Sequence, residues 1–223
     1  SLGRGAHLRL TADAQMPRVV ILGEAAVAGS LVYHHTYSQT NGLDLVFALA
    51  DHECDAMTGL WINGNPVTWN SSTGAVAEFS GMSVRFHSGA WGQTADATVI
   101  ANSDGRWSPT GRGRGICYVA ISMSYNASLY QGRQPSFLFK IKGAKLYDWR
   151  KDSTSGGSGS HRWATPSTWE WSDNPAIAWY NYRRGIFVNG ARVAGMTTAA
   201  DSLPLDAATA AANACDETVA LNA

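Results

Sequence analysis

The chain has 223 residues, of which 45% are hydrophobic and 15% charged, and its 17 basic residues balance its 17 acidic residues. Because basic residues are not in excess, the composition argues against electrostatic binding to nucleic acid or to an anionic membrane surface. No run of 18 apolar residues occurs, which excludes a membrane-spanning helix and leaves a globular chain able to bury one or two cores.

Runs of β-branched and aromatic residues punctuated by glycine predict a meander of short strands in the first half of the chain. The Asn63-Gly64 pair predicts a two-residue turn of type I′, because both residues tolerate positive φ. Pro66 lacks an N–H, which predicts an edge position for the strand after this turn. The predicted strands occupy residues 18–22, 31–36, 43–50 and 58–62.

Two further strands are predicted at residues 116–124 and 136–141. Both are apolar with few charges, which is typical of central strands. The GRGRG run before the first of them has two interpretations, a phosphate contact through Arg112 and Arg114 or a turn leading into the strand. Because the chain has no net charge, we favour the turn.

The segment DNPAIAWYNYRRG predicts a helix, because Asn174 can cap the first turn and Pro175 suits the first helical position. Gly185 suits the end of the helix, while Arg183 and Arg184 fall in its last turn, where the helix dipole favours cations.

Within this helix, the core is expected to receive most of its contacts from Ile177, Ala178 and Trp179. A second helix is predicted over residues 203–217, since small apolar residues recur there at spacings of three and four. That stripe consists of Leu205, Ala208, Ala212, Cys215 and Val219. Both predicted helices lie late in the chain.

The segment 151–161, KDSTSGGSGSH, has little to bury and predicts a flexible loop. The fold class expected from these elements is mainly β with a few short helices (α+β), built from barrel-like or sandwich modules. Residues 1–115 form one β-rich module, and residues 116–223 form a second β module with the two helices and the loop, unless the two interleave as one compact unit.

Cys54, Cys117 and Cys215 are widely spaced and form no CxxC pair, so we expect free thiols in the core and no zinc or redox site. The N-terminal stretch SLGRGAHLRLTADAQ has no apolar region or cleavage motif typical of a secretion signal, so we expect a chain made and folded in a cytoplasm.

Three constellations of titratable residues invite a catalytic or metal-binding interpretation, and each fails on spacing. In Asp51 to Asp55, the helical zinc motif HExxH would need a second histidine where the chain has Ala56, and on an extended segment His52 and Cys54 face away from the carboxylates. The adjacent pair His34-His35 would point to opposite sides of a strand. We therefore expect structural roles here.

The third constellation, Ser158 to His161, lacks the G-x-S-x-G elbow of a serine nucleophile and falls in the predicted loop. Neither a catalytic residue nor a metal or cofactor site is expected, and the chain is predicted not to be an enzyme.

Five of the nine tryptophans fall within 31 residues. Exposed indoles stack on sugar rings in carbohydrate-binding β-sandwiches, and indoles are also enriched at permanent protein interfaces. We favour an interface and keep glycan binding as the alternative. The candidate interface residues are Trp149, Trp163, Trp169, Trp171, Arg183 and Arg184.

Five phrases along the chain resemble, in the same order, the tail hub family of long-tailed bacteriophages and gene transfer agents, which includes host-specificity proteins at the tips of lambdoid tails. One departure is that family members often have Pro-Arg after KLYD, where this chain has Trp149-Arg150. Family members are also longer, so the chain resembles a central piece of one. The phrases are RVVILGEAAVAG (Arg18 to Gly29), DLVFALADHECDAMTGLWING (Asp44 to Gly64), the stretch from Arg106 to the KGAKLYD that ends at Asp148, WSDNPAIAWYNY (Trp171 to Tyr182) and ANACDE (Ala212 to Glu217).

The resemblance implies a structural virion protein at the tail tip, or baseplate hub, in which three copies form a ring that closes the tail tube and links it to the distal fibre. It implies partners in the distal tail protein, the tail tube and the tape-measure protein, with transient passage of DNA through a central channel and indirect contact with the host surface. Assembly would take place in the host cytoplasm. The alternative function is that of a carbohydrate-binding β-sandwich that contacts host cell-surface glycans.

Overall fold

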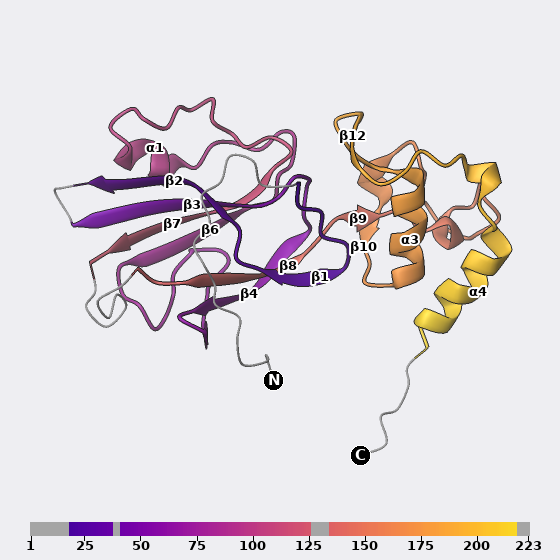
Figure 1. Cartoon of the computed structure of the whole chain (residues 1–223), viewed down its shortest axis with the longest axis horizontal. Coiled ribbons are helices and arrows are strands. Elements are labelled where there is room, and N and C mark those ends of the chain that lie inside the picture. Colours follow the sequence, from indigo (N-terminus) through magenta and orange to yellow (C-terminus); the bar gives the residue numbers. More distant parts are fainter. Residues whose placement is uncertain (1–17, 38–40, 126–133, 218–223) are drawn as a thin grey trace, which may run out of the picture.

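The computed structural model of the chain describes residues 18–37, 41–125 and 134–217. Most of the regular structure consists of antiparallel strands, joined by three short α-helices, which confirms the expected α+β class dominated by β-structure. Figure 1 shows two parts side by side, a β-sandwich and a smaller, mostly helical part. Among the described residues the sheets pack face to face and do not close into a barrel.

The first sheet has the strand order β2-β3-β7-β6, and the second has the order β1-β8-β4-β5. Every neighbouring pair is antiparallel. Each sheet combines strands from before and after residue 115, so the two predicted modules share one sandwich. The strands are β1 (Glu24–Val27), β2 (Ser30–Tyr37), β3 (Gly42–Ala50), β4 (Ala56–Ile62), β5 (Asn65–Val67), β6 (Met82–His87), β7 (Cys117–Ser124) and β8 (Phe137–Lys142).

The main core lies between these sheets. Phe47 on β3 packs against Phe137 and Phe139 on β8, with ring centroids 5.7 and 5.8 Å apart. All three rings are at most 3% exposed, and removing apolar surface of this size from water is the main force that holds the sheets together. The predicted central positions of the strands at 116–124 and 136–141 are confirmed, because β7 and β8 each have a neighbour on both sides.

The predicted strand at residues 18–22 is wrong, since this segment is irregular and β1 begins only at Glu24. Its backbone donors bond to side chains instead of a sheet: Val19 N donates to Asp51 Oδ2 and Ile21 N donates to His52 Nε2. Gly23, with φ of 76°, then turns the chain into β1. The predicted strands at 31–36, 43–50 and 58–62 correspond to β2, β3 and β4.

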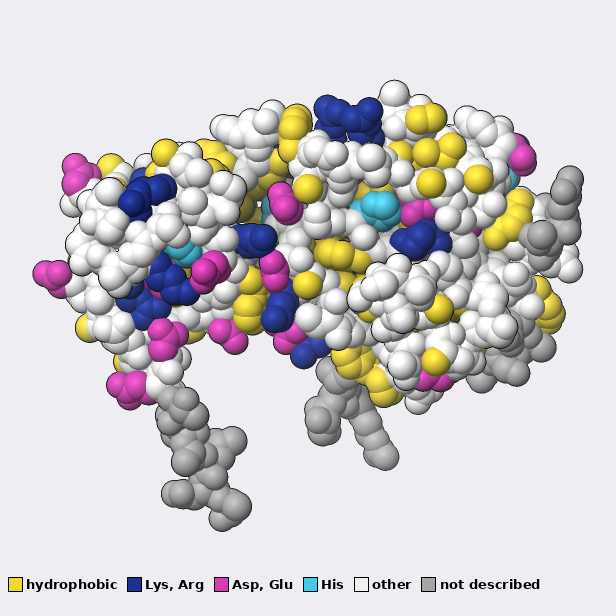
Figure 2. Space-filling view, turned by 180° about the vertical axis from the view of Figure 1, so that it is seen from behind, with side chains coloured by type: hydrophobic (Ala, Val, Ile, Leu, Met, Phe, Trp, Pro, Cys, Tyr) yellow, Lys and Arg dark blue, Asp and Glu magenta, His cyan; other side chains and the backbone are white. Residues whose placement is uncertain are grey.

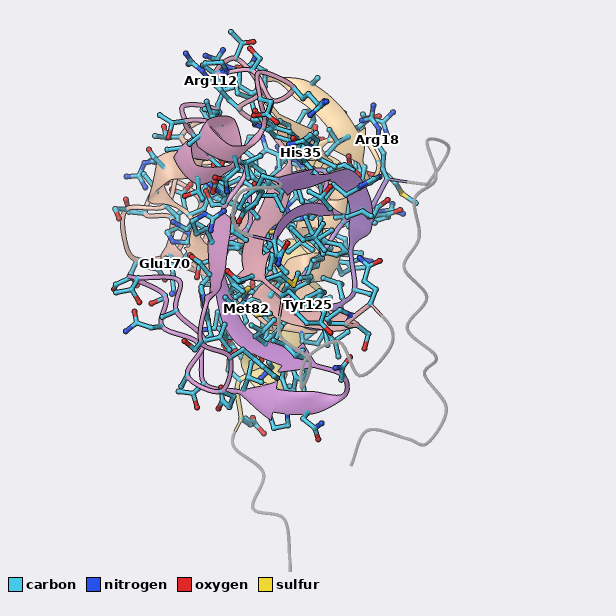
Figure 3. All side chains as sticks on the ribbon, turned by 90° about the vertical axis from the view of Figure 1, so that its left-hand side faces the viewer. Arg18, His35, Met82, Arg112, Tyr125 and Glu170 are labelled. Carbon is cyan, nitrogen blue, oxygen red and sulfur yellow. The ribbon has the colours of Figure 1, made fainter. Side chains whose placement is uncertain are left out.

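The turns lie where the sequence predicts them. Asn63 and Gly64 both have positive φ, 51° and 81°, as the predicted hairpin turn between β4 and β5 requires. Pro66 lies on β5, at the edge of its sheet, as expected. The GRGRG run is a turn that leads into β7, and Figure 3 shows Arg112 at the outer edge of the molecule.

One helix was not expected from the sequence. The helix α1 (Ala97–Asn102) begins at Asp96, whose side chain accepts a hydrogen bond from Val99 N. It covers the outer face of the first sheet, where Val99 packs with Val46 and Tyr118. Six residues are too few for an apolar period to stand out, which is why the sequence did not predict this helix.

The smaller part follows β8 and contains two predicted helices and four very short strands (Figure 1). Its own core packs helices α3 and α4 against β9 and a cluster of aromatic rings. None of the helices in the described ranges is long and apolar enough to cross a membrane. The elements are β9 (Lys145–Leu146), β10 (Glu170–Trp171), α3 (Pro175–Arg184), β11 (Ile186–Val188), β12 (Ala191–Ala194) and α4 (Leu205–Cys215), with 3-10 turns at Trp149–Lys151, Pro166–Thr168 and Ala200–Ser202.

The ends of α3 are those predicted, but its buried face is not. The Asn174 side chain caps the helix by accepting from Ala176 N and Ile177 N. Trp179, expected in the core, is 43% exposed, and the buried positions are Ile177, Tyr180 and Asn181. The error has a simple cause: the inward face follows the spacing i, i+3, i+4 from Ile177, which points residue 179 outward.

The apolar stripe of α4 is shorter than predicted. Ala208 and Ala212 are buried, whereas Cys215 is exposed, and Val219 lies outside the described residues. The expectation of core thiols therefore holds for Cys54 and Cys117 and is wrong for Cys215.

Candidate assembly interface

The tryptophan-rich segment forms the core of the smaller part. Tyr147 lies at its centre, with the ring of Trp163 edge-on at 5.5 Å and the rings of Trp169 and Tyr180 each 6.1 Å away. Trp149 packs on Tyr180 with centroids 4.5 Å apart. Edge and tilted arrangements of this kind are favoured by the ring quadrupoles, so the cluster adds specific geometry to apolar burial.

The indole N–H groups of this cluster are also used internally. Trp149 is buried and donates to Thr209 Oγ1 on α4 at 2.8 Å. Trp169 donates to the Arg162 carbonyl at 2.8 Å, and Trp171 donates to the Gly23 carbonyl of the sandwich at 3.2 Å. Of the four predicted interface indoles, Trp149 is thus unavailable to a partner, and the other three are half-buried.

The two predicted interface arginines behave differently. Arg184 lies over the Trp163 ring, 4.0 Å from its centroid, and donates to the Tyr180 hydroxyl. This cation–π contact ties the end of α3 to the aromatic cluster. Arg183 is half-buried, and its Nε has no hydrogen-bond partner among the described residues.

A polar cluster centred on Arg150 joins three segments that are far apart in the sequence. Its guanidinium donates to both carboxylate oxygens of Asp148 and, at 2.8 Å, to Asp216 after α4. The hydrogen bonds that Arg150 donates to Asp148, and then to Asp216, raise the pKa of Arg150. Asn174 donates to the other oxygen of Asp216 at 2.7 Å and to the Ala212 carbonyl at 2.8 Å. The Arg150 cluster, as we name these residues, fixes α4 against the start of α3.

Asn181 makes a second link of the same kind. Its side-chain oxygen accepts from Tyr147 N at 3.0 Å, while its nitrogen donates to the Tyr147 and Ile177 carbonyls. Asn181 is 1% exposed, so these bonds satisfy a buried amide that would otherwise be costly. Polar residues of the KLYD, DNPA, WYNY and ANACDE phrases therefore bond to one another directly.

The glycine- and serine-rich loop is held at both ends, which corrects the expectation of a free loop. Asp152 accepts from Thr154 Oγ1 at 2.6 Å, from Tyr147 Oη at 2.7 Å and from Arg162 at 3.0 Å. Hydrogen bonds from Thr154 and then from Tyr147 lower the pKa of Asp152 to about 2. His161 at the far end is buried, and its Nδ1 accepts from Asp148 N.

Two of the histidines that invited a catalytic interpretation, His52 and His161, bond to the backbone, whereas His35 contacts the side chains of Arg106 and Asp104. His52 Nε2 accepts from Ile21 N at 2.9 Å, and its Nδ1 lies 2.7 Å from the Glu53 carbonyl. The alternation predicted for residues 51–55 is confirmed, with His52 and Cys54 buried and Glu53 and Asp55 exposed. Within the described ranges, no group of three or more histidine, cysteine or acidic side chains is placed to hold a metal ion.

One exposed apolar surface lies on the outer face of α3 and on and just after the β11–β12 hairpin. Trp179 and Tyr182, one turn apart, are 43% and 44% exposed, and Phe187 and Met196 are each 46% exposed. Met196 N donates to the Tyr182 carbonyl at 2.8 Å, which brings the hairpin beside the end of the helix. We call these four residues the apolar patch. Sequence reasoning missed it because it assigned Trp179 to the core.

A groove runs beside the patch, between the smaller part and the sandwich. It has a volume of about 420 Å³ and is lined on one side by His52 and Glu53 of the β3–β4 connection and on the other by Trp169, Ile186 and Phe187. Phe187 belongs to both the patch and the groove, so the patch adjoins the groove at the junction of the two parts.

No family model matches the sequence, and no curated protein matches it. A chain in a structure titled "Virion of native gene transfer agent (GTA) particle" is 23% identical, with a TM-score of 0.49 over 84% of the present chain. The match covers 39% of that chain, so the present chain spans less than half of its length.

Proposed function

We propose that this chain is a structural virion component, a tail-tip or baseplate hub protein. In this proposal three copies form a ring that closes the tail tube, with a channel through which DNA passes. Its partners are the distal tail protein, the tube and the tape-measure protein.

One observation carries the proposal: the phrases that resemble the hub family meet in space. Asp148 of KGAKLYD, Asn174 of DNPA and Asp216 of ANACDE bond through or beside Arg150. These residues hold the elements of the smaller part together. Such use of the most characteristic residues suits a protein whose role is architectural.

The charge distribution is compatible with a conduit. Basic and acidic residues number 17 each, and Figure 2 shows them interspersed over one face. A channel wall with a basic excess would bind the phosphate backbone and retard DNA, because phosphate contacts dominate affinity. A balanced surface avoids this.

The glycan-binding alternative requires a groove lined by coplanar indoles. Trp163 and Trp169 are 5.3 Å apart but tilted by 35°, and both pack on Tyr147. The indole rings of Trp163 and Trp169 therefore pack in the core of the smaller part. Trp91 and Trp179 are the large exposed indoles of the described chain, and they lie on the sandwich and on α3 respectively.

The test is assembly of tails by the particle that encodes this chain. Trp179→Ser combined with Tyr182→Ser should leave the chain folded and reduce intact tails at least tenfold, because it removes two of the four residues of the apolar patch. The matched control is Trp91→Ser, which removes an indole that is 48% exposed on the sandwich and should assemble normally.

Normal tail numbers in the double variant would contradict the proposed interface. If the variant assembled tails but no longer bound a purified host polysaccharide that the unaltered chain binds, the glycan-binding alternative would replace the hub.

A further inference from the structure

Two of the three cysteines lie together in the core of the sandwich. Cys54 belongs to the extended connection between β3 and β4, and Cys117 is the first residue of β7. They are 1% and 0% exposed and belong to the same buried apolar cluster. Sixty-two residues separate them in the sequence, so their proximity is a product of the fold alone.

The short segment after β6 holds the two cysteines close. Cys54 N donates to the Ser88 carbonyl at 2.8 Å. The next residue, Gly89, lies so near to Cys117 that a Cβ on it would be 2.8 Å from Cys117 N and 2.9 Å from the His52 carbonyl. The two backbones thus approach each other at Gly89, and the Cys54 and Cys117 thiols are close enough to influence each other's ionisation.

His52 completes this site. Its Nδ1 and its carbonyl oxygen are each 3.9 Å from the sulfur of Cys54. The hydrogen bond from Cys117, and to a smaller degree the His52 ring, lower the pKa of the Cys54 thiol, and the same contact raises the pKa of Cys117. Thiolate character makes Cys54 the nucleophile of the pair.

The pair is buried but lies close to a surface. His52 and Glu53 form part of the wall of the groove between the sandwich and the smaller part. Only the groove wall formed by His52 and Glu53 separates a small oxidant in this groove from Cys54. A local opening of the β3–β4 connection would therefore let the oxidant reach the Cys54 sulfur.

We propose that Cys54 and Cys117 form an intramolecular disulfide when the protein meets a peroxide. The Cys54 thiolate attacks the O–O bond, which breaks to give a sulfenic acid and hydroxide, and the proton lost by the thiol converts the hydroxide to water. Cys117 then attacks the sulfenic sulfur; the S–S bond forms, a second water leaves, and the peroxide has been reduced as the two thiols are oxidised.

This cross-link is independent of the proposed assembly role. It joins the β3–β4 connection, which links the two sheets, to the central strand β7, and closing a loop of this length constrains the unfolded chain. Cys215 is exposed on α4 and offers a chemically identical thiol without a partner cysteine nearby.

The experiment uses the Cys215→Ala chain, reduced and then treated with hydrogen peroxide in buffer without denaturant. After alkylation of free thiols and digestion without reductant, mass spectrometry should find one peptide pair joined through Cys54 and Cys117. Thiol titration in denaturant should fall from two groups to none and be restored by dithiothreitol. The thermal midpoint should rise by roughly 5 °C or more in the oxidised form.

The controls are Cys54→Ala and Cys117→Ala, each combined with Cys215→Ala, which should retain one titratable thiol and give no cross-linked peptide. The result with Cys215→Ala decides the question even if these core variants do not fold. Two thiols that remain titratable after peroxide treatment, oxidation to sulfinic acid without a cross-link, or a disulfide that forms only in denaturant would each overturn the proposal.

Discussion

Gly143, the second residue of the KGAKLYD phrase, lies where the backbone passes very close to another segment of the chain. Its N donates to the Gly23 carbonyl, and the following Ala144 N donates to the Ile21 carbonyl, so two chain segments run against each other here. A Cβ at position 143 would overlap the carbonyl group of Ile21. Backbone atoms cannot yield as a flexible side chain does, and only glycine fits.

Gly143→Ala should therefore lower the free energy of unfolding by about 2 to 3 kcal/mol, the scale of an overpacked core site. Gly92→Ala is the matched control, because a Cβ at Gly92 would meet nothing within 4 Å. The control should change stability by less than about 0.5 kcal/mol. Urea denaturation of both variants measures the difference, and equal stability of the two would show that the Ile21 segment can move aside.

Asn174 does more than cap a helix. Removing the cap alone costs about 1 kcal/mol. Its side-chain nitrogen also donates hydrogen bonds to Asp216 and to the Ala212 carbonyl. Asn174 is 5% exposed, so Asn174→Ala leaves these two acceptors without their donor in a buried site. We expect a total loss of about 2 to 4 kcal/mol in denaturant unfolding.

The matched controls for Asn174 are a conservative change and a neighbour. Asn174→Asp keeps the capping oxygen but loses the donors to Asp216, so it should remain clearly destabilised. Pro175→Ala should cost less than about 1 kcal/mol, because the first helical position has no required N–H bond to lose. A full rescue by Asp would mean that the cap alone matters.

At the scale of elements, acid should release the loop at residues 151–161. The pKa of Asp152 is lowered to about 2, so this carboxylate stabilises the fold above its ordinary pKa near 4, and the contribution is lost as the pH falls from about 4 to about 2. The near-ultraviolet circular dichroism of Tyr147 and the surrounding indoles should change in that window. Asp152→Asn should already lack the contribution at neutral pH, and an identical acid profile in both proteins would refute the assignment.

Tryptophans beneath α3 and on its outer face should contribute differently to stability. Trp149→Ala removes a buried ring from the core that α3 covers and should cost about 3 to 5 kcal/mol. Trp179→Ala removes a ring that is 43% exposed and should cost about 1 kcal/mol or less. Thermal unfolding of the two variants makes the comparison, which would fail if Trp179 proved the more costly.

At the scale of the whole molecule, the two parts share more than a linker. Trp171 of the smaller part donates to the Gly23 carbonyl, and Lys142 of β8 lies over its ring at 4.3 Å. Leu22, from the segment before β1, packs into the aromatic core. The sandwich therefore supplies a wall of the smaller part, and the apolar patch is held in a fixed position beside the groove.

Features that depend only on residues near one another in the sequence could be predicted from the sequence. The strands β2, β3, β4, β7 and β8, the Asn63-Gly64 turn and the limits of α3 follow from side-chain period, backbone preference and capping, all of which act within a few residues. The alternation that buries His52 and Cys54 belongs to the same class. Helix α1 was missed because its six residues are too few to show an apolar period.

Tertiary structure alone decided which distant residues meet. Nothing local to Asn174 indicates Asp216 as its partner, and nothing local to Cys54 indicates Cys117. Residues 18–22 have the composition of a strand, but Asp51 and His52 take their N–H groups, so the competition for hydrogen bonds was settled by long-range contacts. Trp179 is exposed for a related reason: the direction from which α3 meets its core is set by Tyr147 and α4, and hydrophobicity alone does not encode that direction.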